Sequence, residues 1–135
     1  LNGTTYTTRY SYDTLGSLVT IQDNQGNLKN IGYDSFGRRT WLSDVHASAD
    51  TDYGKWFFTY DANSNLATMT DANNAVVQYS YDELDRTVSE NLQGGGSDTA
   101  ISYTYDTGEN GIGYLATATA GSKSFTKYDY NYRGR

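Results

Sequence analysis

The chain has 135 residues and a net charge of −6, and it contains no cysteine, which excludes disulfides and cysteine-based metal sites. The balance of 16 Asp and Glu against 10 Lys and Arg opposes nucleic-acid binding, which requires a basic surface. Fourteen tyrosines and two tryptophans indicate an aromatic core rather than disorder, because each ring can bury roughly 150–250 Å².

The length is typical of one domain, and we expect a single domain over 1–135. No apolar run approaches the ~18 residues that a membrane-spanning helix needs, so no membrane span is expected. The sequence starts without a basic-then-apolar leader, so we expect either that a leader was removed or that the chain is an internal fragment.

A repeated phrase marks the predicted strands in chain order. It reads YSYD at 10–13, FTYD at 58–61, YSYD at 79–82 and YTYD at 103–106. Because residues i and i+2 of a strand point to one face, each phrase places two rings on one side of a sheet just before a turn. The repeat tyrosines are Tyr12, Tyr33, Tyr60, Tyr81, Tyr105 and Tyr130.

An aspartate-based turn is expected after each of these strands, and again at the opposite strand ends. The aspartate carboxylate should accept backbone N–H bonds from the residues two and three positions on. The fourth residue should have positive φ, which glycine and asparagine tolerate, with Asn74 and Asp85 in place of glycine. The expected turn residues are Asp13, Gly16, Asp23, Gly26, Asp34, Gly37, Asp61, Asp71, Asp82, Asn131 and Gly134.

The segments between the turns alternate, as in SLVTIQ at 17–22 and NLATMT at 65–70. No segment keeps a 3.6-residue apolar stripe, so essentially no helix is expected. The short connections predict an all-β fold, an antiparallel meander of about eleven short strands.

Residues 42–54 form the longest predicted loop, in which His46 is expected to be exposed. Ser43 and Asp44 lie near His46, but neighbours along a loop rarely have the geometry of a catalytic triad. The acidic residues of this loop do not continue as a calcium loop, and the glycines at 94–96 are expected in a flexible hairpin loop. We therefore expect no catalytic residue, no metal site and no cofactor, and no enzyme activity.

Residues 33–38 (YDSFGR) and 23–28 (DNQGNL) resemble the YD-repeat, or Rhs-repeat, family, whose unit is approximately YDxxGRLxxxxDxxG. The resemblance covers nearly the whole chain in five to six repeats. Members of that family are bacterial Rhs and Wap-type polymorphic toxins, cocoon proteins of insecticidal toxin complexes, and teneurins. The resemblance implies a curved sheet or a segment of a hollow β-shell in a secreted or cell-surface protein.

The resemblance also has limits. The self-cleaving core that follows the repeats in toxin members has no counterpart here, and the chain has no proline and therefore no Asp-Pro. A complete shell takes many more repeats, so the expected partners are the rest of a parent chain or other copies, through edge strands at 4–12 and 124–130. The alternative function is binding of carbohydrate or a cell surface by exposed rings, with Trp41 and Trp56 as possible contacts.

Overall fold

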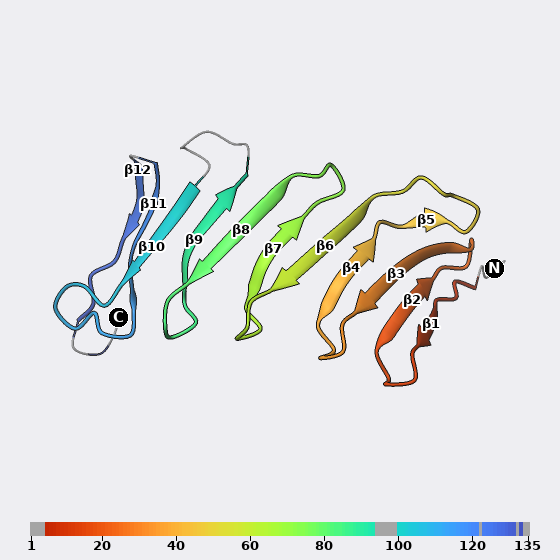
Figure 1. Cartoon of the computed structure of the whole chain (residues 1–135), viewed down its shortest axis with the longest axis horizontal. Helices are drawn as coiled ribbons and strands as arrows, with labels where there is room; N and C mark the ends of the chain where they lie inside the picture. Colours follow the sequence, from red (N-terminus) through yellow and green to blue (C-terminus); the bar gives the residue numbers. More distant parts are fainter. Residues whose placement is uncertain (1–4, 94–99, 122, 132, 134–135) are drawn as a thin grey trace. The chain divides into compact units, whose positions relative to one another are not determined.

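Figure 1 shows a computed structural model of the chain, which describes residues 5–93, 100–121, 123–131 and 133. Within these ranges every regular element is a β-strand. The strand pairs within each part of the chain are antiparallel. The all-β antiparallel fold expected from the sequence is therefore confirmed, and the described residues contain no helix that could cross a membrane.

The contacts between Cα atoms divide the chain into two compact units, and each is described by itself. Unit 1 comprises residues 1–59 and 69–74, and unit 2 comprises residues 60–68 and 75–135. The single domain over 1–135 remains a prediction.

Unit 1 is a meander in which consecutive strands pair, in the order β1-β2-β3-β4-β6, with the short β5 beside β3 (Figure 1). In β4, Trp41 lies opposite Gly32 on β3 and Phe57 on β6. Its strands are β1 (Arg9–Tyr12), β2 (Leu18–Gln22), β3 (Asn27–Tyr33), β4 (Arg39–Ser43), β5 (His46–Ala47) and β6 (Lys55–Tyr60), of which Tyr60 falls in unit 2.

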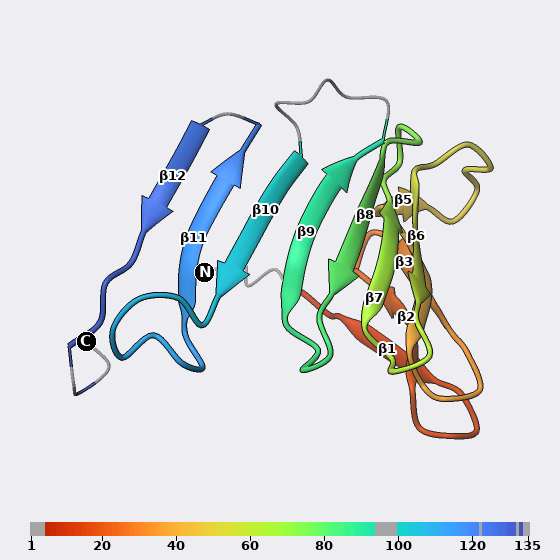
Figure 2. The same ribbon diagram turned by 60° about the vertical axis from the view of Figure 1, so that its left-hand side comes forward.

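Unit 2 is a second meander, in the order β8-β9-β10-β11-β12, which Figure 2 shows more openly. The strand β7 (Leu66–Thr70) is shared, with its first three residues in unit 2 and its last two in unit 1. The other strands are β8 (Val76–Tyr81), β9 (Thr87–Leu92), β10 (Ala100–Tyr105), β11 (Leu115–Ala120) and β12 (Lys123–Lys127).

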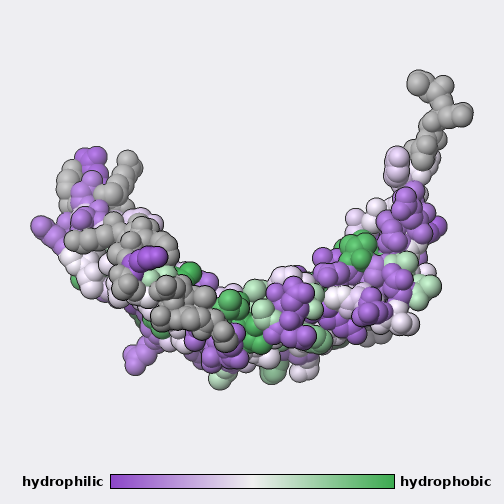
Figure 3. Space-filling view, turned by 90° about the horizontal axis from the view of Figure 1, so that it is seen from above, coloured by the Kyte–Doolittle hydropathy of each residue, from purple (hydrophilic) through white to green (hydrophobic). Residues whose placement is uncertain are grey.

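The two faces of the strands differ, as the alternating sequence predicts. In β8, Tyr79 and Tyr81 are half-buried, whereas Gln78 and Ser80 are exposed, and β10 repeats this pattern. Among the described residues only Ala116 and Ala120 form a buried hydrophobic core. Figure 3 accordingly shows small hydrophobic patches between hydrophilic residues. The stability of the fold therefore depends on half-buried rings and hydrogen bonds rather than on a fully buried hydrophobic core.

Candidate functional site

Aspartate carboxylates accept backbone hydrogen bonds at the turns. In the turn after β3, Asp34 Oδ1 accepts hydrogen bonds from the N–H groups of Phe36 and Arg38, both at 2.9 Å. The predicted second donor, three positions on, is wrong, because the N–H of Gly37 donates instead to the backbone carbonyl of Asp34 at 3.0 Å. The pair of bonds from residues two and four positions on recurs at Asp13, Asp23, Asp61 and Asp82.

The fourth residue of these turns has a left-handed backbone. A type I turn followed by one left-handed residue is a common hairpin connection. An added Cβ at Gly16, Gly26 or Gly37 would meet nothing within 4 Å, so the requirement at these positions is conformational rather than steric. The φ angles are 84° at Gly16, 88° at Gly26, 77° at Gly37, 72° at Ser64, 64° at Asn74 and 59° at Asp85.

Three further turns also begin with a side-chain oxygen that accepts a backbone N–H. Asp71 accepts the N–H of Asn73 at 2.8 Å, and Asn131 accepts the N–H of Arg133 at 2.9 Å. Gly134, the expected end of the last turn, lies outside the described residues. Asp106 Oδ1 accepts the N–H of Gly113 at 2.7 Å, because residues 107–113 lengthen that connection.

The repeat tyrosines connect neighbouring strands through their hydroxyl groups. Tyr33 on β3 donates to the carbonyl of Leu18, the first residue of β2, at 3.0 Å. Tyr12, on the edge strand β1, is 60% exposed and has no such acceptor among the described residues. The same bond joins Tyr81 to Leu66 at 2.9 Å, Tyr105 to Thr87 at 2.8 Å and Tyr130 to Leu115 at 2.7 Å.

Charged side chains connect successive turns in unit 2. Arg86 Nε donates to Asp82 Oδ2 at 2.7 Å within its own turn. The two terminal nitrogens of Arg86 donate to both oxygens of Asp106 in the next repeat, at 3.0 and 2.7 Å. Its guanidinium also lies 4.4 Å from the ring centre of Tyr105. This bidentate geometry is the strong form of a carboxylate–guanidinium contact.

The bonds between turns change the acidity of the carboxyl groups. The Arg86 guanidinium, and next the N–H of Gly113, lower the pKa of Asp106 from 3.8 to about 2. Hydrogen bonds from the side chains of Asn63 and then Asn65, at 2.9 and 2.6 Å, lower the pKa of Asp85. Both carboxylates are therefore ionised partners of neighbouring turns rather than proton-transfer groups.

The segment 42–54 is more ordered than the sequence predicted. His46 is 8% exposed, so the prediction of an exposed loop histidine is wrong. Its ring stacks on Tyr53 with the ring centres 3.7 Å apart, its Nδ1 lies 2.8 Å from the carbonyl oxygen of Asp44, and β5 pairs with β3. Ser43, which is fully buried, accepts the N–H of Asn30 at 2.8 Å, so it does not stand ready as a nucleophile.

The two tryptophans lie on opposite faces of unit 1. Trp41 shares a face with Phe57, whereas Trp56 shares the other face with Leu42. Trp41 covers Gly32, where an added Cβ would meet the indole, and Lys55 Nζ lies 5.6 Å from its ring centre. Trp56 Nε1 donates to Asp44 Oδ1 at 3.3 Å. The structure therefore does not bring the two indoles together on one platform.

The candidate site is thus a set of hydrogen bonds between neighbouring repeats, called joints below. The joints are Tyr33 to Leu18, Tyr81 to Leu66, Tyr105 to Thr87, Tyr130 to Leu115 and Arg86 to Asp106. In the described ranges no group of three or more His, Asp or Glu residues could hold a metal ion. Sequence reasoning missed the carbonyl acceptors of the tyrosines and the bond between Arg86 and Asp106. One available signal was the recurrence of arginine four positions after the turn aspartate, at Arg38 and Arg86.

Comparison with known proteins finds a matching family model and a matching curated protein. A family model described as RHS Repeat matches residues 60–97. The tRNA3(Ser)-specific nuclease WapA of Bacillus spizizenii is 30% identical over 136 residues, which cover 93% of this chain and 6% of WapA.

Solved structures of toxin complexes share the fold. A TcdB2-TccC3 structure without its hypervariable C-terminal region superimposes with a TM-score of 0.73 at 22% identity, covering 93% of this chain and 6% of that one. The Photorhabdus luminescens Tc holotoxin pore gives 0.71 at 22% identity, with the same coverage of 93% and 6%. This chain therefore corresponds to a small part of each of these proteins.

Proposed function

The chain belongs to the YD-repeat, or Rhs-repeat, family, and from this premise we propose that it forms part of the wall of a larger secreted or cell-surface protein. The observation that carries the proposal is the set of joints between repeats. The hydroxyl group of Tyr81 donates a hydrogen bond to the carbonyl of Leu66, and Arg86 donates hydrogen bonds to Asp106. Hydrogen bonds of this kind connect a repeat to the one before or after it. Such joints stiffen a sheet, and the proposed role is structural rather than enzymatic.

The parent protein is proposed to be a shell that encloses a toxin. Support comes from the fold shared with the Tc holotoxin pore and from the likeness to the WapA nuclease, of which this chain matches 6%. The test is a cryo-electron microscopy structure of the full-length parent. We expect β1 and β12 to pair with strands of adjoining repeats around an enclosed space. A separate domain whose two edge strands both face solvent would contradict the proposal.

The isolated chain is further proposed to associate through its edges, with residues 4–12 of one copy against 124–130 of another. Every residue of β1 is exposed, and open edges of this kind pair readily when they carry little charge. Light scattering over a wide concentration range should show oligomers. Tyr10→Lys on β1 should reduce them, whereas Phe36→Lys, in an exposed turn, should not. A monomer at every concentration would contradict edge pairing.

Binding of carbohydrate is the alternative function. The structure gives each indole its own face, so Trp41→Ala and Trp56→Ala test two separate surfaces. If either surface binds, the matching substitution alone should abolish retention on a glycan array while the fold persists. An array without hits for the folded chain would remove the alternative.

A further inference from the structure

Glu90 occupies an unusual place for an acidic residue. In the part of the chain that the structure describes, it is the only Asp or Glu inside a strand, since the others lie in turns and connections. It is half-buried in β9, near the middle of unit 2. A carboxylate that is partly removed from water loses hydration, and this loss must be offset by partners.

The register places Glu90 on the tyrosine face. It lies opposite Tyr79 on β8 and opposite Ile101 on β10, and residues that are directly opposite share a face. Tyr103, two positions after Ile101, lies on that face as well. The other face of these strands carries uncharged polar side chains, namely Gln78, Ser80, Ser89, Asn91, Ser102 and Thr104.

One oxygen of Glu90 already has a partner. The hydroxyl group of Tyr103 donates to Glu90 Oε1 at 2.9 Å. Burial and then this bond to Glu90 raise the pKa of Tyr103 to about 12. Burial and the charge of Glu90 also raise the pKa of Tyr79. The carboxylate therefore creates a negative potential that both phenols experience.

No described cation balances this charge. Among the described residues Glu90 forms no ion pair, and Arg86, which lies four positions before it, pairs instead with Asp82 and Asp106. Lys123 lies in the same row of the face, opposite Ala120, which itself lies opposite Ile101. It is three strands away in the sheet order, or ~14 Å at the usual strand spacing, which is too far for an ion pair.

We propose that Glu90, with the rings of Tyr79 and Tyr103, is a binding site for a primary ammonium group. The oxygen that Tyr103 leaves open accepts an N–H, and aromatic faces attract the cation. An ammonium suits the site, because its compact charge needs only the oxygen that Tyr103 leaves open, whereas a planar guanidinium gains most from binding across both oxygens of a carboxylate. This inference does not depend on the proposed wall function.

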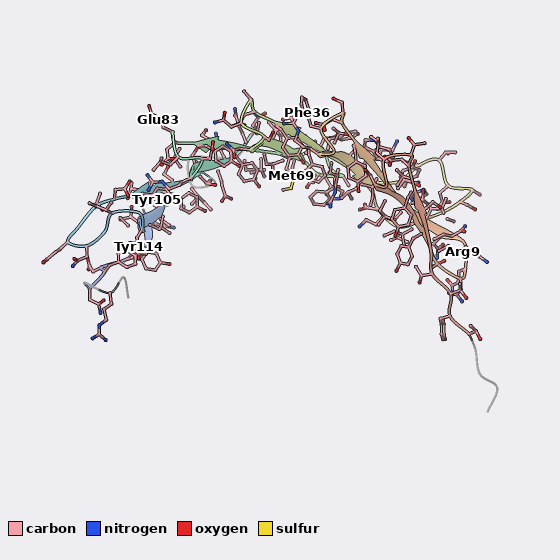
Figure 4. The ribbon with its side chains drawn as sticks, turned by 90° about the horizontal axis from the view of Figure 1, so that it is seen from below. Arg9, Phe36, Met69, Glu83, Tyr105 and Tyr114 are labelled. Carbon is pink, nitrogen blue, oxygen red and sulfur yellow. The ribbon has the colours of Figure 1, made fainter. Side chains whose placement is uncertain are left out.

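The test is an NMR titration with n-butylammonium at constant ionic strength. It uses the whole chain, with ¹³C labels in the tyrosine rings. We expect saturable shifts of the Tyr79 and Tyr103 signals, and at least tenfold weaker binding for Glu90→Gln. Glu83→Gln is the matched control, because it removes the same charge from an exposed turn residue, labelled in Figure 4, and should bind as the parent chain does.

A lysine peptide then identifies the source of the ammonium, and an arginine peptide tests the choice of cation. Acetyl-Ala-Lys-Ala-amide binding more tightly than n-butylammonium would assign the site to a polypeptide lysine, whereas equal binding would assign it to a small amine. If Glu90→Gln does not fold, Glu90→Asp replaces it in the test. The aspartate side chain is shorter by one methylene, which moves the carboxylate away from the rings and should also weaken binding. Undiminished binding in the Glu90 variant, or equal binding of acetyl-Ala-Arg-Ala-amide, would overturn the proposal.

Discussion

The hydroxyl group of Tyr81 donates to the carbonyl oxygen of Leu66, 15 residues earlier in the chain, at 2.9 Å. Tyr33 and Tyr130 repeat the bond with the same separation of 15 residues. Each of these rings is half-buried, so the tyrosine contributes both apolar area and a hydrogen bond. Phenylalanine could supply the apolar area but not the hydrogen bond, which explains why the repeated position is a tyrosine.

Tyr33→Phe should therefore destabilise the fold. It leaves the carbonyl of Leu18 without its donor, at a cost of about 0.5–1.5 kcal/mol. Tyr12→Phe is the matched control, because Tyr12 is 60% exposed and has no described acceptor. Urea unfolding monitored by circular dichroism measures both variants. Equal effects of the two substitutions would show that the hydroxyl bond contributes nothing.

Gly37→Val should destabilise the turn after β3 by about 1 kcal/mol or more, because valine tolerates positive φ poorly. Gly37 has φ of 77°, and the space around an added Cβ is open, so the loss reports backbone strain alone. Gly37→Asn should cost less, since Asn74 holds a φ of 64° at the corresponding position of another turn. An unchanged melting temperature for Gly37→Val would refute the assignment.

Asp34→Asn should be milder than Asp34→Ala. The amide oxygen can still accept the N–H groups of Phe36 and Arg38, as Asn131 accepts that of Arg133, whereas alanine leaves them without a partner. The asparagine variant loses only the charged contact with Arg38 Nε at 2.8 Å. Thermal unfolding compares the two variants. Comparable losses would assign the main role to the charge instead.

Stability should fall in acid. The pKa of Asp106 is lowered in the folded chain from 3.8 to about 2, first by Arg86, and Arg86 also lowers that of Asp82 through its backbone N–H. The unfolded chain therefore binds protons more readily than the folded chain does. The stabilisation is complete at a pH above the pKa of the unfolded chain, and it is lost as the pH falls through the pKa of the folded chain. Denaturant midpoints from pH ~5 to ~2 measure the loss.

Asp106→Asn should flatten this dependence, because the variant has no carboxyl at that position to protonate. Arg86→Gln should flatten it as well, since the lowered pKa of Asp106 depends first on Arg86. If both variants kept the slope of the parent chain, the acid sensitivity would originate in other carboxyl groups.

The turns could be predicted from the sequence because their geometry accepts few residue types. A left-handed backbone at the fourth position favours glycine or asparagine, which predicted Gly26 as a turn residue. A turn whose N–H needs an acceptor two residues earlier favours aspartate, which predicted Asp23. Alternation of polar and apolar residues similarly predicted the tyrosine face of β8.

The joints between repeats could not be predicted in the same way. A backbone carbonyl such as that of Leu18 has no sequence signature, so the acceptor of Tyr33 depends on the register of β2 and β3. The burial of His46 likewise depends on Tyr53 reaching its ring from the far end of a polar segment. Local patterns specify turns and faces, whereas these contacts arise only after the strands have paired.

The short chain separation of the tyrosine bonds also affects the order in which the molecule forms. A bond such as that of Tyr130 to Leu115, 15 residues apart, closes only a small loop and loses little chain entropy. Each hairpin can therefore nucleate as soon as its own residues are available, and the next can be added to it, as in other repeat proteins. A long chain built from such repeats would fold progressively during synthesis, without waiting for its distant end.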